Sequence, residues 1–93
     1  MSSKKEKVFY NFIDKIFWEQ WDPVGINKDI KARNEYYGYI PIVFSEALKH
    51  ENENHIASLL FSIEKDRMGL EGNYEKCLIV AKKILNEKLE IFR

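Results

Sequence analysis

The sequence predicts an all-α fold: a compact four-helix arrangement with a long aromatic-rich connection between the first and second helices. Three observations indicate it. Apolar residues recur at helical spacing in four segments, strand-like alternation is absent from the sequence, and Gly, Pro or Asn residues separate the segments. Because chains divide into several domains only at greater length, we expect residues 1–93 to form a single helical domain.

The first helix is predicted to carry two apolar surfaces, a broad face and an adjoining aromatic stripe. Pro23 and Gly25 end this helix and begin the connection. A helix with so much apolar surface is either central in its domain or covered on its second side, and the segment that follows is the expected cover. The broad face contains Val8, Phe9, Phe12, Ile13 and Ile16, and the stripe contains Tyr10, Phe17 and Trp21.

The connection between Trp21 and Pro41 is unusually long for a compact domain, and long connections are often functional. It includes a charged run from Lys28 to Arg33 and is rich in tyrosine. Tyrosine and tryptophan close small cores and also anchor protein interfaces. We expect core positions for Phe17, Trp21 and Tyr36, and we leave core and surface roles equally open for Trp18, Tyr37 and Tyr39.

The remaining helices are predicted from their terminal residues and from one apolar face each. Pro41 suits the first turn of the second helix. Asn52 or Asn54 can cap the third helix, and Asn73 can cap the fourth. Gly69 suits the left-handed position that ends the third helix. The expected inner faces contain Ile40, Val43, Phe44, Ala47 and Leu48, then Ile56, Leu59, Leu60 and Ile63, and finally Tyr74, Cys77, Leu78, Ala81, Ile84, Leu85 and Leu89.

The composition excludes several functional classes. Fifteen basic and fifteen acidic residues give no net charge, and no basic face is visible that would collect phosphate contacts, so we expect no nucleic-acid partner. The single cysteine cannot form an internal disulfide, and no apolar run approaches the length of a membrane span. These features predict a cytoplasmic protein that makes no contact with a membrane.

Two groups of reactive side chains are predicted to be structural. His50 and His55 stand five residues apart across an expected turn, whereas zinc-binding histidines on a helix stand four apart. We therefore expect the two imidazoles not to converge. Cys77 lies on an apolar helix face and is expected to be a buried, inert thiol. The sequence thus predicts no catalytic residue, no metal site and no cofactor.

Asp22 and Glu35 admit two interpretations, because both carboxylates lie in the aromatic connection. If they met near the aromatic rings, their pKa values could be perturbed for acid/base work in a pocket under the connection. The structural interpretation, which we favour, is that Asp22 caps the turn before Pro23 and that Glu35 pairs with Arg33 or Arg67.

Several short motifs occur in a fixed order along the chain: Trp21-Asp22-Pro23-Val24-Gly25-Ile26-Asn27, Glu35-Tyr36, Tyr39, Pro41, Met68-Gly69-Leu70 and Cys77. In these motifs the chain resembles the YugE-like helical domain, a group of small bacterial proteins of unknown function, over most of residues 16–85. One departure is Tyr37, where the family pattern leads us to expect aspartate. The resemblance implies an all-α fold, and it associates the chain by analogy with immunity proteins of bacterial toxin systems.

These patterns favour a non-catalytic protein-binding module, specifically an immunity protein that binds and neutralises a cognate toxin. The alternatives are a small-molecule-binding protein or enzyme with a pocket under the 21–41 connection, and a homo-oligomeric structural protein. The sequence does not determine the oligomeric state. The predicted partner-binding residues are Trp18, Asp22, Glu35, Tyr37, Tyr39 and Arg67.

Overall fold

The computed structural model describes residues 3–22 and 36–93, and every regular element within these ranges is helical. The α-helices are α1 (Lys4–Ile16), α2 (Ile40–Lys49), α3 (Glu53–Ser62) and α4 (Tyr74–Ile91). Single π-helical turns continue two of them, η1 (Phe17–Trp21) after α1 and η3 (Ile63–Arg67) after α3. Residues 36–39 form a short 3₁₀ turn that leads into α2. The predicted all-α, four-helix arrangement is confirmed, whereas helical periodicity did not predict the two π turns.

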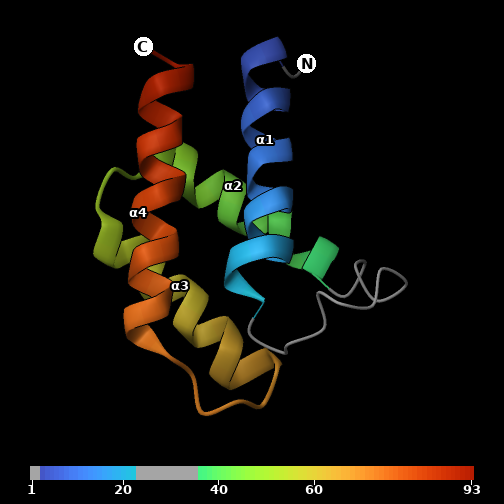
Figure 1. Cartoon of the computed structure of the whole chain (residues 1–93), viewed down its shortest axis with the longest axis vertical. Coiled ribbons are helices and arrows are strands. Elements are labelled where there is room, and N and C mark those ends of the chain that lie inside the picture. The colour runs from blue at the N-terminus through green and yellow to red at the C-terminus, as the bar shows by residue number, and fades with distance from the viewer. Residues whose placement is uncertain (1–2, 23–35) are drawn as a thin grey trace.

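Helices α1 and α4 run alongside each other in opposite directions, so the start of α1 and the end of α4 lie at the same end of the molecule (Figure 1). Helices α2 and α3 cross this pair at an angle (Figure 1). The most extensive contact between helices joins α3 and α4, which follow each other in the chain. The arrangement therefore differs from a regular up-down bundle. Within residues 3–22 and 36–93, no helix is long and apolar enough to cross a membrane.

Helix starts are fixed by side-chain caps that satisfy backbone N–H groups. Ser3 and Glu6 form a capping box at the start of α1, in which Ser3 Oγ accepts a hydrogen bond from the Glu6 N–H at 3.1 Å. Side-chain oxygens of Asn52 and Asn73 cap α3 and α4 in the same way. Pro41 lies in the first turn of α2, as predicted.

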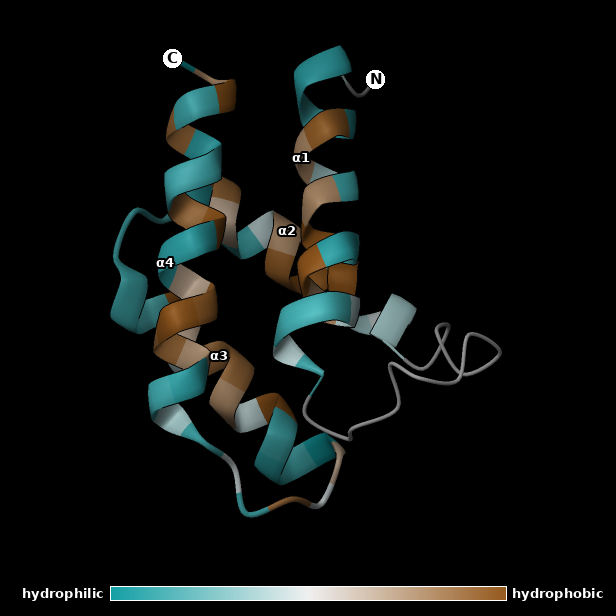
Figure 2. Cartoon of the chain, viewed as in Figure 1, coloured by the Kyte–Doolittle hydropathy of each residue, from teal (hydrophilic) through white to brown (hydrophobic). Residues whose placement is uncertain are grey.

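One hydrophobic core joins the four helices, whose apolar faces turn toward one another (Figure 2). The predicted core positions of Phe17, Trp21 and Tyr36 are confirmed, since these side chains are 0%, 0% and 2% exposed. The other buried apolar residues are Phe9, Ile13, Ile16, Ile40, Val43, Ala47, Ile56, Ala57, Leu60, Ile63, Cys77, Val80, Ala81, Ile84 and Leu85.

Three residues that we placed on inner faces lie at the surface instead. Val8 is 49% exposed, Tyr74 37% and Leu89 58%. On α4 the buried face includes Val80, which we did not place on the inner face, and excludes Tyr74 and Leu89 at its other edge. In α1 the stripe likewise starts at Phe9, which turns Val8 toward solvent.

The two described ends of the 21–41 connection meet. Asp22 ends η1 with a left-handed φ of 31°, and its Oδ1 accepts a hydrogen bond of 2.6 Å from the Tyr36 hydroxyl. Tyr36 begins the 3₁₀ turn before α2, so this contact ties the start of α2 to the end of η1. Four features of the predicted connection lie outside the described residues: Pro23, Gly25, the charged run 28–33 and Glu35.

The turn between η3 and α4 depends on two glycines with left-handed backbones. Gly69 has φ 70°, as its predicted capping role requires, and the next N–H, of Leu70, folds back onto the carbonyl oxygen of Glu64 at 2.9 Å. Gly72 has φ 86°, and a Cβ at this position would lie 2.6 Å from Phe61 Cε1. Gly72 is therefore constrained both by its backbone conformation and by the ring packed against it.

We expect Gly72→Ala to lower the free energy of unfolding by about 2–4 kcal/mol, because it adds left-handed strain to a steric overlap with Phe61. Gly38→Ala is the matched control, since its backbone is not left-handed and a Cβ there meets no atom within 4 Å. This control should be neutral or slightly stabilising. Urea denaturation of both variants tests the pair, and equal stabilities would contradict the prediction.

Candidate functional site

An aromatic cluster at the end of α1 holds the 3₁₀ turn in place. Trp21 is fully buried, and its ring packs against Phe17 with 4.6 Å between centroids. Tyr36 lies against Trp21 at 6.0 Å, and Trp18 stands edge-on to Tyr36 at 6.4 Å. Tyr36 is thus packed between two tryptophans while its hydroxyl is bound by Asp22. These contacts anchor the turn to η1.

The structure brings four of the six predicted partner-binding residues into this region. Trp18 and Asp22 belong to η1 and its cap, and Tyr37 and Tyr39 belong to the turn packed against it. Tyr37 is 47% exposed, whereas Trp18 and Tyr39 are partly buried against the core. Arg67 ends η3, is exposed, and forms no ion pair or hydrogen bond with the other four within the described ranges. Glu35 lies outside those ranges.

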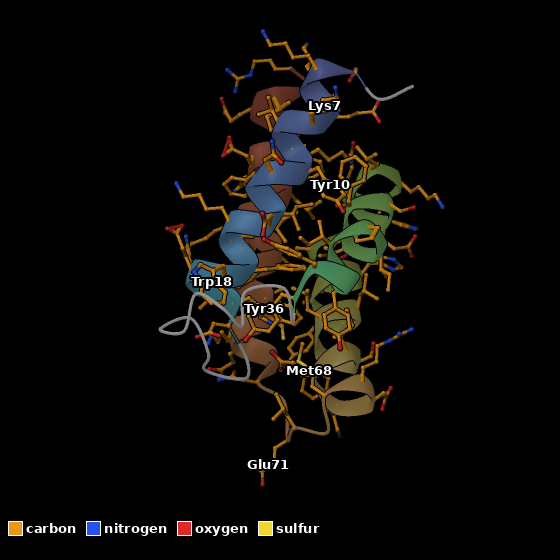
Figure 3. All side chains as sticks on the ribbon, turned by 90° about the vertical axis from the view of Figure 1, so that its right-hand side faces the viewer. Lys7, Tyr10, Trp18, Tyr36, Met68 and Glu71 are labelled. Atoms are coloured by element: carbon orange, nitrogen blue, oxygen red, sulfur yellow. The ribbon has the colours of Figure 1, made fainter. Side chains whose placement is uncertain are left out.

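A surface hollow of about 450 Å³ opens next to this region, between α1 and the start of α2. It is lined by Tyr10, Pro41 and Phe44 together with the polar side chains of Glu6, Lys7 and Asn11. Tyr10 was expected beside Trp21, but its ring instead packs edge-on against Phe44 at 5.2 Å. Figure 3 shows Lys7, Tyr10, Trp18 and Tyr36 along one side of the molecule.

A buried carboxylate that the sequence analysis missed lies beneath the aromatic cluster. Glu64, in η3, is only 2% exposed. Its Oε2 accepts hydrogen bonds from Trp21 Nε1 at 2.7 Å and from Cys77 Sγ at 3.3 Å, and its Oε1 accepts one from the Asn73 N–H at 2.8 Å. One signal could have revealed it: Glu64 lies four residues after Leu60, on the apolar face of its helix.

In the described part of the chain, the buried Glu64 carboxylate is stabilised by hydrogen-bond donors and not by a positively charged side chain. A buried carboxylate is costly unless its oxygens are hydrogen-bonded. Within residues 3–22 and 36–93, no lysine or arginine forms an ion pair with Glu64. Its Asn73 partner is the N-cap of α4, so the carboxylate also lies at the positive end of that helix. Glu64 therefore acts as a tertiary counterpart of the glutamate in a capping box.

The predicted burial of Cys77 is confirmed, because its side chain is fully buried. Burial raises the pKa of Cys77 from 9.0 to about 12, and the hydrogen bond and negative charge of Glu64 act in the same direction. The thiol consequently stays protonated at neutral pH, where it is a poor nucleophile.

The rival hypothesis places a pocket under the connection, lined by Asp22 and Glu35. Asp22 is held by Tyr36, which is the structural role expected of a turn-anchoring carboxylate. The hollow of about 230 Å³ next to Glu64 is lined by Leu70, Gly72, Asn73 and Lys76, and not by Asp22. The described residues thus give Asp22 a contact within the fold, and the contribution of Glu35 stays a prediction.

The expectation that His50 and His55 do not converge is wrong. Their rings stack with 3.9 Å between centroids and 29° between planes. The cause is the tight turn between α2 and α3: His50 is the C-cap of α2, and His55 lies in the first turn of α3. His55 Nε2 is also 3.2 Å from Glu46 Oε1, and this hydrogen bond lowers the pKa of Glu46.

Comparison of the chain with family models, with curated protein sequences and with solved structures gives no match. The resemblance to the YugE-like domain therefore stays a prediction.

We expect Glu64→Ala to lower the free energy of unfolding by about 2–6 kcal/mol, because it leaves the N–H donors of Trp21 and Asn73 without a partner. Trp21→Phe should cost about 1.5–3 kcal/mol for the lost indole hydrogen bond. The double variant should lose less free energy of unfolding than the sum of the losses in the two single variants, because both substitutions remove the same hydrogen bond. Glu71→Ala, an exposed glutamate in the following turn, is the control and should change stability by less than about 0.5 kcal/mol. Strictly additive costs in urea denaturation would count against the network.

The contribution of Cys77 to stability should fall as the pH rises from 9 toward 12. The unfolded thiol ionises above its ordinary pKa of 9.0, whereas the folded thiol stays protonated until about 12, so the unfolded state gains stability across this window. The difference in unfolding free energy between the wild type and Cys77→Ala should therefore decrease by up to about 1.4 kcal/mol per pH unit. Urea denaturation of both proteins at pH 8, 9, 10 and 11 measures this difference. A constant difference would show that the folded-state pKa is not raised.

Proposed function

We propose that this protein is a non-catalytic protein-binding module whose contact surface is an aromatic face, formed by Trp18, Tyr37 and Tyr39 beside the hollow of Tyr10, Pro41 and Phe44. One observation carries the proposal. The exposed Tyr37 projects from the 36–39 turn, in which Tyr36 is the first residue, and both Tyr36 and Ile40, the residue after the turn, are only 2% exposed. A large aromatic side chain is thus exposed to solvent on a backbone that is held in place by the buried side chains of Tyr36 and Ile40.

Such an arrangement favours binding for a thermodynamic reason. Tyrosine offers a large contact area with few rotatable bonds, so little side-chain entropy is lost when it is buried by a partner. The backbone of the turn is already ordered by the Tyr36–Asp22 hydrogen bond and by ring packing on Trp18 and Trp21. Pre-organisation of this kind lowers the cost of association.

The buried reactive groups support a role without catalysis. The carboxylate of Glu64 is engaged by three donors, and the Cys77 thiol is protonated at neutral pH. Both groups act within the fold. Asp22, Glu35 and Arg67 stay the predicted charge partners of this surface.

The resemblance to the YugE-like family extends the proposal to a partner class, a bacterial toxin domain that the protein covers and neutralises in the cytoplasm. This extension rests on analogy and on the charge-neutral, helical character of the chain. A toxin domain encoded immediately upstream would identify the partner to test first.

Tyr37→Ala should weaken partner binding by about tenfold or more, because interface aromatics that enter a partner's pocket carry much of the binding energy. The full-length chain serves as bait in cells of the source organism, and the captured protein is then purified and titrated against each variant by calorimetry. Leu89→Ala is the matched control, since Leu89 is 58% exposed on α4, outside the aromatic face. It should leave the affinity within about twofold.

Equal affinities for wild type, Tyr37→Ala and Glu35→Ala would overturn the assignment of the aromatic face. Sedimentation at two protein concentrations separates this proposal from self-association. A rise in mass with concentration that Tyr37→Ala abolishes would instead assign the face to a homo-oligomer.

A further inference from the structure

Both histidines of the chain meet one carboxylate at the turn between α2 and α3. Glu46 and His50 stand four residues apart at the end of α2, which places them on one helix face. His55 approaches from the first turn of α3. One donor atom from each of the three side chains lies within 4.8 Å of the other two.

The spacing of these donors resembles that of a metal centre. In a tetrahedral zinc site, metal–ligand distances of about 2.0–2.1 Å place neighbouring donor atoms about 3.3 Å apart. His55 Nε2 and Glu46 Oε1 already lie 3.2 Å apart. To bind the same ion, His50 must bring a nitrogen closer by up to roughly 1.5 Å and turn its ring out of the stack with His55, because imidazole binds a metal through a lone pair in the plane of its ring. We propose that Glu46, His50 and His55 bind one divalent transition-metal ion, with Zn²⁺ as the expected metal.

The backbone that carries the three ligands is ordered without a metal. The His50 N–H donates to the Glu46 carbonyl oxygen at 3.0 Å, and Asn52 caps α3 by accepting from the Asn54 N–H at 2.8 Å. Lys88 Nζ lies 3.4 Å from the carbonyl oxygens of both Leu48 and His50, and so ties the end of α2 to α4. Only side-chain rotation is then needed for coordination, which keeps the entropic cost of binding low.

The donor set selects the class of metal. Imidazole nitrogen suits Zn²⁺, Cu²⁺ and Ni²⁺, whereas Mg²⁺ and Ca²⁺ prefer sites built from oxygen. Three protein ligands leave one tetrahedral position open for water.

Hydrogen bonding alone gives these residues little energetic role. The His55 and Glu46 side chains are 40% and 32% exposed, and an ion pair so open to solvent contributes little to stability. The same exposure leaves His55 and Glu46 within reach of a metal ion from solution, and His50 is partly exposed as well.

Zn²⁺ titrated by calorimetry into the full-length, metal-stripped chain should bind with a stoichiometry of one. His50→Gln, His55→Gln and Glu46→Gln should each weaken binding at least about tenfold. Glu51→Gln is the matched control, because it removes a carboxylate from the same turn that is not among the grouped ligands, and it should bind as the wild type does. Zn²⁺ at about ten times its dissociation constant should raise the melting temperature of the wild type by about 5–10 °C, whereas Mg²⁺ should not.

Circular dichroism without metal establishes that each variant is folded, and any one folded ligand variant suffices for the comparison. The absence of Zn²⁺ binding by the wild type would overturn the proposal. Equal Zn²⁺ affinity in the wild type and in folded ligand variants would overturn it as well, since the metal would then bind elsewhere on the chain.

Discussion

The fold depends on satisfying one buried carboxylate, that of Glu64. Its two oxygens collect the indole N–H of Trp21, the backbone N–H of Asn73 and the thiol of Cys77. These donors come from the end of η1 and from the start of α4, while Glu64 itself comes from η3. A charged group is expensive to remove from water, so the three elements must meet in one geometry for the core to close. Hydrophobic burial drives the collapse, and this network specifies which ends come together.

The surface feature with the clearest functional potential follows from that internal constraint. Trp21 is held by its hydrogen bond to Glu64, and its ring packs against that of Tyr36. The Tyr36 hydroxyl in turn donates a hydrogen bond to Asp22. The next residue, Tyr37, is then directed to solvent from an ordered turn. A chain of contacts therefore runs from the deepest polar group to the most exposed aromatic side chain of the 36–39 turn. The histidine cluster at the α2–α3 turn has a different origin, since it depends on the tightness of that turn.

Much of the fold could be predicted because its signals are local. The caps at Asn52 and Asn73, the left-handed Gly69 and the apolar faces of four helices all follow from residues a few positions apart. The errors at Val8 and Leu89 come from the same source. The spacing of apolar residues identifies one face of a helix, but the packing of the neighbouring helices determines which residues at the margin of that face are buried. The assignment of Trp21, Phe17 and Tyr36 to the core was correct because large rings have few other places in a chain of this size.

The all-α class could be predicted from the sequence alone, as could the residues at the starts of α2, α3 and α4, namely Pro41, Asn52 and Asn73. The tertiary structure was needed to place Glu64 in the core and to bring it to Trp21, 43 residues away in the chain. It also decided that His50 and His55 stack, and that Tyr37 rather than Trp18 is the more exposed ring. The physical reason is the range of the interactions. Helix formation and capping act within about one turn, whereas the partner of a buried polar group depends on how the helices cross.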